Sequence, residues 1–167
     1  MTANAANPTT TTGNPTDPTT DQVYRVFIKA TPQAIWDAIT TPEFTTRYFH
    51  GARVDTTAIA GAPMRYYGPD DALWGDNVVI EADPPRRLVA TWTALWNDET
   101  AHEEPSRVTW EIDERDDGVC LLTVVHDRLE GAPKTAGMVG GEGWMMVLSG
   151  LKTLLETGAP LMGPAAS

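Results

Sequence analysis

The stretch TPQAIWDAITTPE, residues 31–43, contains two helix starts in succession. Thr31-Pro32 combines a capping hydroxyl with a proline whose backbone angle suits the first helical position. Ile35 and Ile39 then follow one turn apart, which predicts a short amphipathic helix. Thr41-Pro42 repeats the cap and the proline, so the stretch predicts a bent pair of short helices.

Strand-like runs lie on both sides of this helical pair. Before it, Val23–Lys29 alternates in the sense of a half-buried strand. After it, turn sequences such as Asp83-Pro84-Pro85 and Asp116-Asp117-Gly118 separate short runs rich in β-branched and aromatic residues, which predicts antiparallel hairpins. The best strands in this region are Val78–Ala82, Leu88–Trp96, Arg107–Ile112 and Val119–His126.

The last predicted element is a long amphipathic helix. Gly158 is a natural C-terminal cap for it, and the preceding segment Gly131–Gly143 contains five glycines and one proline, which favours a mobile loop able to gate a cavity. The apolar stripe of the helix has members four, three and four residues apart: Trp144, Leu148, Leu151 and Leu155.

Length and composition indicate one soluble domain. The chain has 167 residues, of which 41% are hydrophobic and 21% charged. We expect a disordered Thr/Pro-rich leader over residues 1–21, the domain over 22–158 and a flexible tail over 159–167. The sequence has neither a signal peptide nor an apolar run long enough to span a membrane, and the single cysteine, Cys120, lies in an apolar strand. These features favour the cytoplasm and no membrane insertion.

The net charge restricts the partners. Twelve Lys and Arg against 23 Asp and Glu give a formal charge of −11, so the mean field repels phosphate backbones. We therefore expect no nucleic-acid binding.

Three blocks of sequence resemble one known family. Residues 31–43 look like the opening motif of SRPBCC proteins related to the heat-shock protein 90 ATPase activator, Glu81–Trp92 is similar to their central hairpin, and Gly143–Gly158 to their final helix. The similarity covers Val23–Gly158. It implies the α+β helix-grip fold of the START-like, or Bet v 1-like, superfamily, with a curved seven-stranded antiparallel sheet around a long C-terminal helix and two short helices after the first strand. Tyr48 is a departure, because that position is often Trp, and the change is expected to reshape the cavity mouth.

The resemblance also implies a pocket for lipophilic or aromatic ligands between the helix and the sheet. The strand tryptophans either clamp a planar ligand there or simply pack the core, and the sequence leaves both interpretations open. Methionines near the glycine-rich segment are either adaptable pocket walls or gap fillers. The candidate ligand-binding residues are Tyr48, Tyr66, Trp74, Trp92, Trp110, His126, Met138, Trp144 and Leu148.

Two titratable residues are candidates for proton transfer if the protein is an enzyme. His126 shares a strand face with Leu122 and Val124, so we expect it to point inward, as a hydrogen-bonded structural residue rather than an acid or base. The register of Glu81 is not fixed by the sequence, and a solvent-facing or ion-paired residue is favoured over a partner for His126.

Other polar groups predict no cofactor or metal. His102-Glu103-Glu104 lacks further ligands at helical spacing and is interpreted as a solvated loop, and Asp76 and Asn77 as turn and edge groups. The glycines of 131–143 follow no strand and lack the lysine of a phosphate loop.

Three functions follow as hypotheses. The first is a carrier, sensor or sequestering protein for a small hydrophobic molecule. The second is a cyclase- or hydratase-like enzyme that uses the same pocket, and a non-enzymatic role is favoured over it. The third is a chaperone-associated interaction domain with a chaperone partner, as in the name-giving relatives. An exposed strand edge is also compatible with a homodimer.

Overall fold

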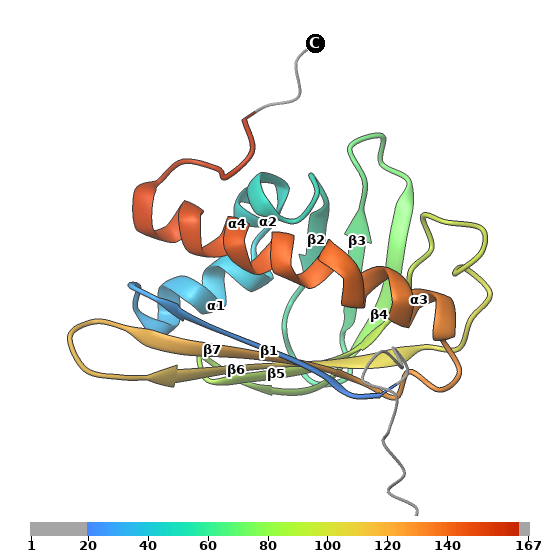
Figure 1. The fold of residues 1–167 in the computed structure, drawn as a ribbon, viewed down its shortest axis with the longest axis horizontal. Helices are drawn as coiled ribbons and strands as arrows, with labels where there is room; N and C mark the ends of the chain where they lie inside the picture. Colours follow the sequence, from blue (N-terminus) through green and yellow to red (C-terminus); the bar gives the residue numbers. More distant parts are fainter. Residues whose placement is uncertain (1–19, 164–167) are drawn as a thin grey trace, which may run out of the picture.

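A seven-stranded antiparallel sheet with helices over one face is the frame of the protein (Figure 1). The computed structural model describes residues 20–163. The strands are β1 (Gln22–Ile28), β2 (Arg53–Thr56), β3 (Pro63–Tyr67), β4 (Leu73–Asp83), β5 (Arg87–Trp92), β6 (Ser106–Glu114) and β7 (Cys120–Asp127). The helices are α1 (Pro32–Thr40), α2 (Pro42–Tyr48), α3 (Pro133–Met138) and α4 (Trp144–Thr157), with a π-helical turn at Val139–Gly143.

The strand order β1-β7-β6-β5-β4-β3-β2 brings the first strand beside the last. The pairing runs from Gln22 opposite His126 to Ile28 opposite Cys120, and all the other neighbouring strands are also antiparallel. Helix α4 crosses the face of this sheet, α1 lies between α4 and the strands, and α2 lies beside α4 (Figure 1). The predicted helix-grip fold is confirmed.

The two helix starts in residues 31–43 form as their sequence predicts. The Thr31 hydroxyl accepts a hydrogen bond from the Ala34 amide over 3.1 Å, and Pro32 is the first residue of α1. Thr41 has extended backbone angles, which separate α1 from α2 and let Pro42 start the second helix.

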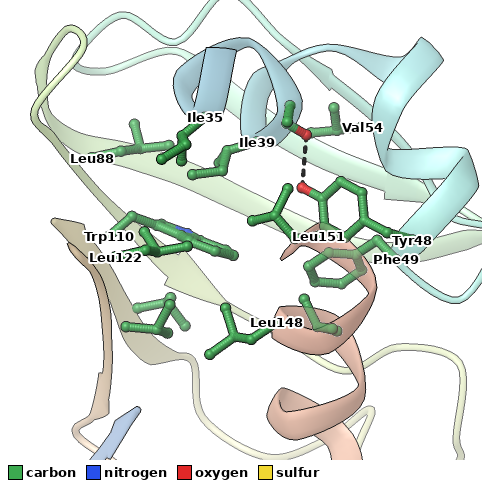
Figure 2. Close-up of a cluster of buried hydrophobic side chains, with 14 of the residues drawn as sticks. Ile35, Ile39, Tyr48, Phe49, Val54, Leu88, Trp110, Leu122, Leu148 and Leu151 are labelled. Atoms are coloured by element: carbon green, nitrogen blue, oxygen red, sulfur yellow. Dashed lines mark hydrogen bonds between the residues drawn. The ribbon is translucent and has the colours of Figure 1, made fainter. Parts of the chain in front are cut away.

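Helices α1 and α4 and the sheet share one core. Figure 2 shows their apolar side chains converging, with Tyr48 and Phe49 closing the group from the end of α2. The Tyr48 hydroxyl donates to the Ala38 carbonyl over 2.7 Å, so the end of α2 is tied to α1. The labelled side chains from α1, the sheet and α4 are Ile35, Ile39, Val54, Leu88, Trp110, Leu122, Leu148 and Leu151.

Two predicted strands have other bounds. Strand β5 ends at Trp92 rather than Trp96, because residues 93–105 turn back on themselves, with the Thr100 hydroxyl donating to the Ala94 carbonyl over 2.6 Å. Strand β4 begins at Leu73, so Asn77 is a buried mid-strand residue and not an edge group. Trp96 therefore lies in the β5–β6 loop, and its predicted place on a strand is wrong.

The prediction of a mobile loop over Gly131–Gly143 is also wrong. The segment forms α3 and the π-helical turn, which is kinked at Gly141 and leads into α4. Thr135 and Ala136 are buried, so the helix is packed despite its glycines. Gln22 donates to the Ala136 carbonyl over 3.0 Å, which fixes α3 to the first strand.

The predicted ends of the domain fall partly beyond the described chain. Of the leader predicted over residues 1–21 and the tail predicted over 159–167, residues 1–19 and 164–167 lie outside the described residues. Within residues 20–163 no helix has the length and apolar character needed to cross a membrane.

Candidate ligand-binding cavity

A cavity of about 390 Å³ lies under the start of α4. It is bounded by the end of α2, the strands β3 to β5, the β5–β6 loop, α3 and the π-helical turn. We call it the aromatic cavity, because six of its lining residues are Phe, Tyr or Trp. The lining residues are Phe49, His50, Ala52, Tyr66, Trp74, Gly75, Trp92, Thr93, Trp96, Met138, Val139, Glu142, Gly143, Trp144 and Val147.

The rings pack in contact with one another and form the wall of the cavity. Phe49 stacks on Tyr66 with ring centroids 5.1 Å apart, and Trp92 lies 5.4 Å from Trp144 in a tilted arrangement. Phe49 also meets the Trp144 ring edge-on at 6.2 Å. Because each ring is held by its neighbours, the wall is largely preformed, as small-molecule sites usually are.

Two glycines make room for this wall. A side chain at Gly68 would collide with the Trp74 indole, because an added Cβ would lie 2.3 Å from the nearest ring carbon. At Gly75 an added Cβ would lie 3.4 Å from the Tyr66 ring and 3.2 Å from Asn77 Nδ2. Gly75 lines the cavity, so its missing side chain contributes to the free space.

His126 lies behind the wall, and both of its ring nitrogens are hydrogen-bonded. Trp144 Nε1 donates to His126 Nδ1 over 3.0 Å. The other nitrogen, Nε2, therefore carries the proton and donates to Ser106 Oγ over 2.7 Å. The Ser106 hydroxyl in turn donates to the Trp92 carbonyl over 3.5 Å. This chain of hydrogen bonds joins α4 to β7, β6 and β5 beside the cavity.

Burial keeps this histidine neutral. The side chain has no exposed surface, and desolvation lowers the pKa of His126 to about 4, although the nearby Asp127 carboxylate acts in the opposite direction. Asp127 is itself bound on the outer face by Arg107, which donates from Nε over 2.8 Å and from a second nitrogen. With both nitrogens bound and no contact with the cavity, His126 positions Trp144 and is not placed to exchange protons with a guest.

Two buried donors near the cavity lack partners among residues 20–163. They are Trp92 Nε1 and Asn77 Nδ2. The Asn77 side chain is held at its other atom, because Oδ1 accepts from the Thr93 hydroxyl over 3.0 Å. Unpaired buried donors cost free energy, so each of these two groups calls for an explanation.

Helix α3 covers one end of the cavity and is capped by the β5–β6 loop. The Glu103 carboxylate accepts hydrogen bonds from the Lys134 amide, the Thr135 amide and the Thr135 hydroxyl, at 2.8, 2.8 and 2.7 Å. Burial alone would raise the pKa of Glu103, but these hydrogen bonds lower it below its ordinary value. Glu103 is thus a helix cap supplied from a distant loop, where the sequence predicted only a solvated residue. We call α3 and the π-helical turn the lid.

A family model described as "Activator of Hsp90 ATPase homolog 1-like protein" matches residues 29–156 of this chain. The chain belongs to this family. The SRPBCC assignment made from the three sequence blocks is thereby confirmed. No curated protein matches the chain.

Solved structures of similar proteins have the same fold as this family member. Protein MLL2253 from Mesorhizobium loti is 20% identical with a TM-score of 0.68, covering 81% of this chain and 96% of its own. PFC0360w, an HSP90 activator from Plasmodium falciparum, is 17% identical with a TM-score of 0.66, and the match covers 82% of this chain and 96% of that one. The Aha1 dimer from Colwellia psychrerythraea is 16% identical with a TM-score of 0.63, and the match covers 83% of this chain and 97% of that one. At these identities the likeness shows the fold alone.

Five of the nine candidate ligand-binding residues of this family member line the aromatic cavity: Tyr66, Trp74, Trp92, Met138 and Trp144. The other four, Tyr48, Trp110, His126 and Leu148, are buried but do not line it. Tyr48 instead borders a second hollow, of about 480 Å³, between α2 and the chain after α4. Trp110 meets the Trp144 ring edge-on at 5.4 Å and supports the wall from behind.

Sequence reasoning missed several lining residues. Phe49 follows α2 directly, Val147 lies one turn after Trp144 in α4, and Glu142 lies in the π-helical turn. The helical spacing of Trp144 and Val147 was a usable signal for α4. Nothing in the sequence indicated that the kinked segment around Glu142 covers the cavity.

The two proton-transfer candidates lie apart in the structure. Glu81 is exposed on the outer face of β4 and pairs with Arg87 Nε at 3.2 Å. His126 is enclosed on the inner side of β7. An acid–base pair of these residues is therefore ruled out, and the interpretation of Glu81 as an ion-paired strand residue holds. The described residues contain no group of three or more His, Cys, Asp or Glu that could hold a metal ion.

Proposed function

We propose that this protein binds a small hydrophobic or aromatic molecule in the aromatic cavity, as a carrier, sensor or sequestering protein. The observation that carries the proposal is a volume of about 390 Å³ that the surrounding aromatic side chains leave unfilled. Cavities of roughly 300 to 1,000 Å³ with apolar walls are typical of small-molecule sites. The family's fold supports the proposal without specifying the ligand.

The chemistry of the wall favours binding over catalysis. Inside the cavity the polar side chains are few, and the phenol of Tyr66 is kept protonated because burial raises its pKa. His126, the strongest candidate base, holds both nitrogens in structural hydrogen bonds. Among the described lining residues the aliphatic hydroxyl is that of Thr93, and it donates to the Asn77 amide oxygen rather than to a base.

A titration with N-phenyl-1-naphthylamine, a neutral apolar fluorophore, tests the proposal. We expect its emission to rise and shift to the blue saturably at about one molecule per chain, with quenching of tryptophan emission and a higher melting temperature. The lining tryptophans Trp74, Trp92, Trp96 and Trp144 are the internal reporters. The affinities of a panel of other neutral aromatic and lipid molecules then show which ligand shape the cavity prefers. Absence of saturable binding by every member of the panel would remove the proposal.

A chaperone-associated role is the second candidate. It is favoured by the family match and by the Plasmodium falciparum relative, whose printed description is an HSP90 activator. This role would use the outer surface in the cytoplasm and would be independent of the cavity. Two measurements test this role: co-sedimentation of this protein with the Hsp90 of the same cell, and the ATPase rate of that Hsp90 with and without this protein. No binding and an unchanged rate would exclude it.

A homodimer through an exposed edge strand is an accompanying proposal about assembly. Strand β1 lies at one edge of the sheet and exposes Val23 and Phe27, at 50% and 57% of their surface. Light scattering across a concentration series reports the mass directly. A monomer at every concentration would contradict the dimer.

A further inference from the structure

The charged groups of the aromatic cavity are of one sign. Among residues 20–163, Glu142 is the only acidic residue that lines it, no Lys or Arg does, and His50 is the one imidazole there. Glu142 lies in the π-helical turn with its side chain exposed, so it stands at the mouth of the cavity rather than in its depth. An anionic guest would therefore meet a carboxylate at the entrance and no lysine or arginine, and the exposed His50 is counted as neutral at pH 7.

The carboxylate of Glu142 is available. Within residues 20–163 it forms no salt bridge, whereas basic residues on strands near the cavity are already paired. Arg53 binds Asp71 at 2.8 Å and Arg65 binds Asp76 at 3.0 Å. These pairs hold the two guanidinium groups on partners outside the cavity, so neither neutralises Glu142.

The wall of the cavity suits a cation. Aromatic rings carry negative charge on their faces, and an ammonium group within about 6 Å of a ring centroid is attracted to it. Five of the six pairs among the rings of Phe49, Tyr66, Trp92 and Trp144 have centroids 5.1 to 6.2 Å apart, so a guest beside them meets several rings at once. The net charge of −11 also raises the concentration of cations near the surface.

We propose that the ligand of the aromatic cavity is a cation, an apolar or aromatic body bearing an amine or quaternary ammonium group, and that Glu142 binds this group at the mouth. This inference rests on the proposed function and narrows it to one class of ligand. The apolar body occupies the space between the rings, and the charged group remains partly hydrated beside the carboxylate.

Three probes of one shape and different charge test it. They are 1-naphthylmethylamine, which is positive at pH 7, the neutral 1-naphthalenemethanol, and the negative 1-naphthaleneacetic acid. We expect the amine to bind about threefold or more tighter than the alcohol, and the acid to bind weakest, as judged by isothermal titration. Added salt should narrow the difference between the amine and the alcohol.

The variant Glu142→Gln removes the charge at the mouth. It should weaken the amine about threefold and leave the alcohol unchanged. The control is Asp116→Asn, which removes the same charge from the exposed β6–β7 turn, at the other end of the sheet from α3 (Figure 1). This control should alter neither affinity.

The outcomes separate this inference from the proposed function. An alcohol that binds as tightly as the amine, or an acid that binds most tightly, overturns the charge preference and leaves cavity binding intact. An amine preference that survives in Glu142→Gln overturns the role of that carboxylate. Failure of all three probes to bind overturns the inference, and it overturns the proposed function as well only if N-phenyl-1-naphthylamine and the rest of the neutral panel also fail to bind.

Discussion

Trp144 Nε1 donates a hydrogen bond of 3.0 Å to Nδ1 of the fully buried His126. The same indole forms part of the wall of the aromatic cavity. A residue at the start of α4 is thereby fixed to β7, and through Ser106 to β6. The position of the wall depends on this link, so the cavity and the stability of the protein are coupled at one histidine.

Removing the Trp144 Nε1 donor should destabilise the protein by more than the smaller phenyl ring alone would. Trp144→Phe leaves His126 Nδ1 buried without its donor, which costs about 1 to 3 kcal/mol. Trp36→Phe is the matched control, because Trp36 is a buried core residue of α1 for which no side-chain hydrogen bond is present among residues 20–163. Urea denaturation should show a larger loss for Trp144→Phe. Equal losses in the two variants would contradict a structural role for the bond.

Stability should fall as the pH drops from about 6.5 towards 4. The folded pKa of His126, about 4, lies below the unfolded value of 6.5, so the unfolded chain binds the proton more readily in this range. A difference of this size corresponds to about 3 kcal/mol lost across the interval. Urea denaturation at several pH values in wild type and His126→Leu isolates the effect. Between pH 6.5 and 4 the free energy of unfolding should fall more steeply with pH in wild type than in His126→Leu. Parallel curves for the two proteins would show that His126 does not cause the loss of stability.

Filling the cavity should abolish ligand binding. Val147 is buried and lines the cavity, so Val147→Phe places a ring in the space available to a guest. The control is Met145→Phe, since Met145 lies two residues earlier on α4 with 52% of its surface exposed. Titration with N-phenyl-1-naphthylamine should show at least tenfold weaker binding for Val147→Phe and no change for the control. Unchanged binding in a folded Val147→Phe protein would place the site elsewhere.

Removing the Glu103 cap should increase the local opening of α3 in the lid. Glu103→Ala removes the acceptor of the Lys134 and Thr135 amides, at a cost of about 1 kcal/mol at the start of α3. Hydrogen exchange should become about fivefold faster in α3 without a change in the β6 and β7 amides. Glu99→Ala, an exposed residue of the same loop, serves as the control. Equal protection of α3 in all three proteins would contradict the cap.

Several elements of the fold could be predicted because their signals are local, whereas the arrangement of the elements into a helix-grip fold was expected from the family resemblance. The Thr-Pro pairs start α1 and α2, and the alternation in Val119–His126 correctly predicts that Leu122, Val124 and His126 face inward. Cys120 is likewise the buried apolar residue that its position in β7 predicts. Each of these features depends on residues close together in the chain.

The site was only partly predictable because its deciding contacts are distant in sequence. Glu103 caps a helix 31 residues further on, and that helix forms where the glycine content favoured a loop. The partners of His126 lie 18 and 20 residues away, so no local pattern indicated them. Aromatic residues could be assigned to the inner face, but which of them line the cavity and which pack behind it depends on where α4 crosses the sheet.

The indole N–H resonances of the tryptophans, observed by ¹H–¹⁵N NMR during titration with N-phenyl-1-naphthylamine, test the central claim most directly. The account predicts saturable shifts for Trp92, Trp144 and the other lining tryptophans, with Trp36, which does not line the cavity, left unchanged. Shifts confined to Trp36, or no shift at any indole at saturating probe, would contradict a binding site between the sheet and α4.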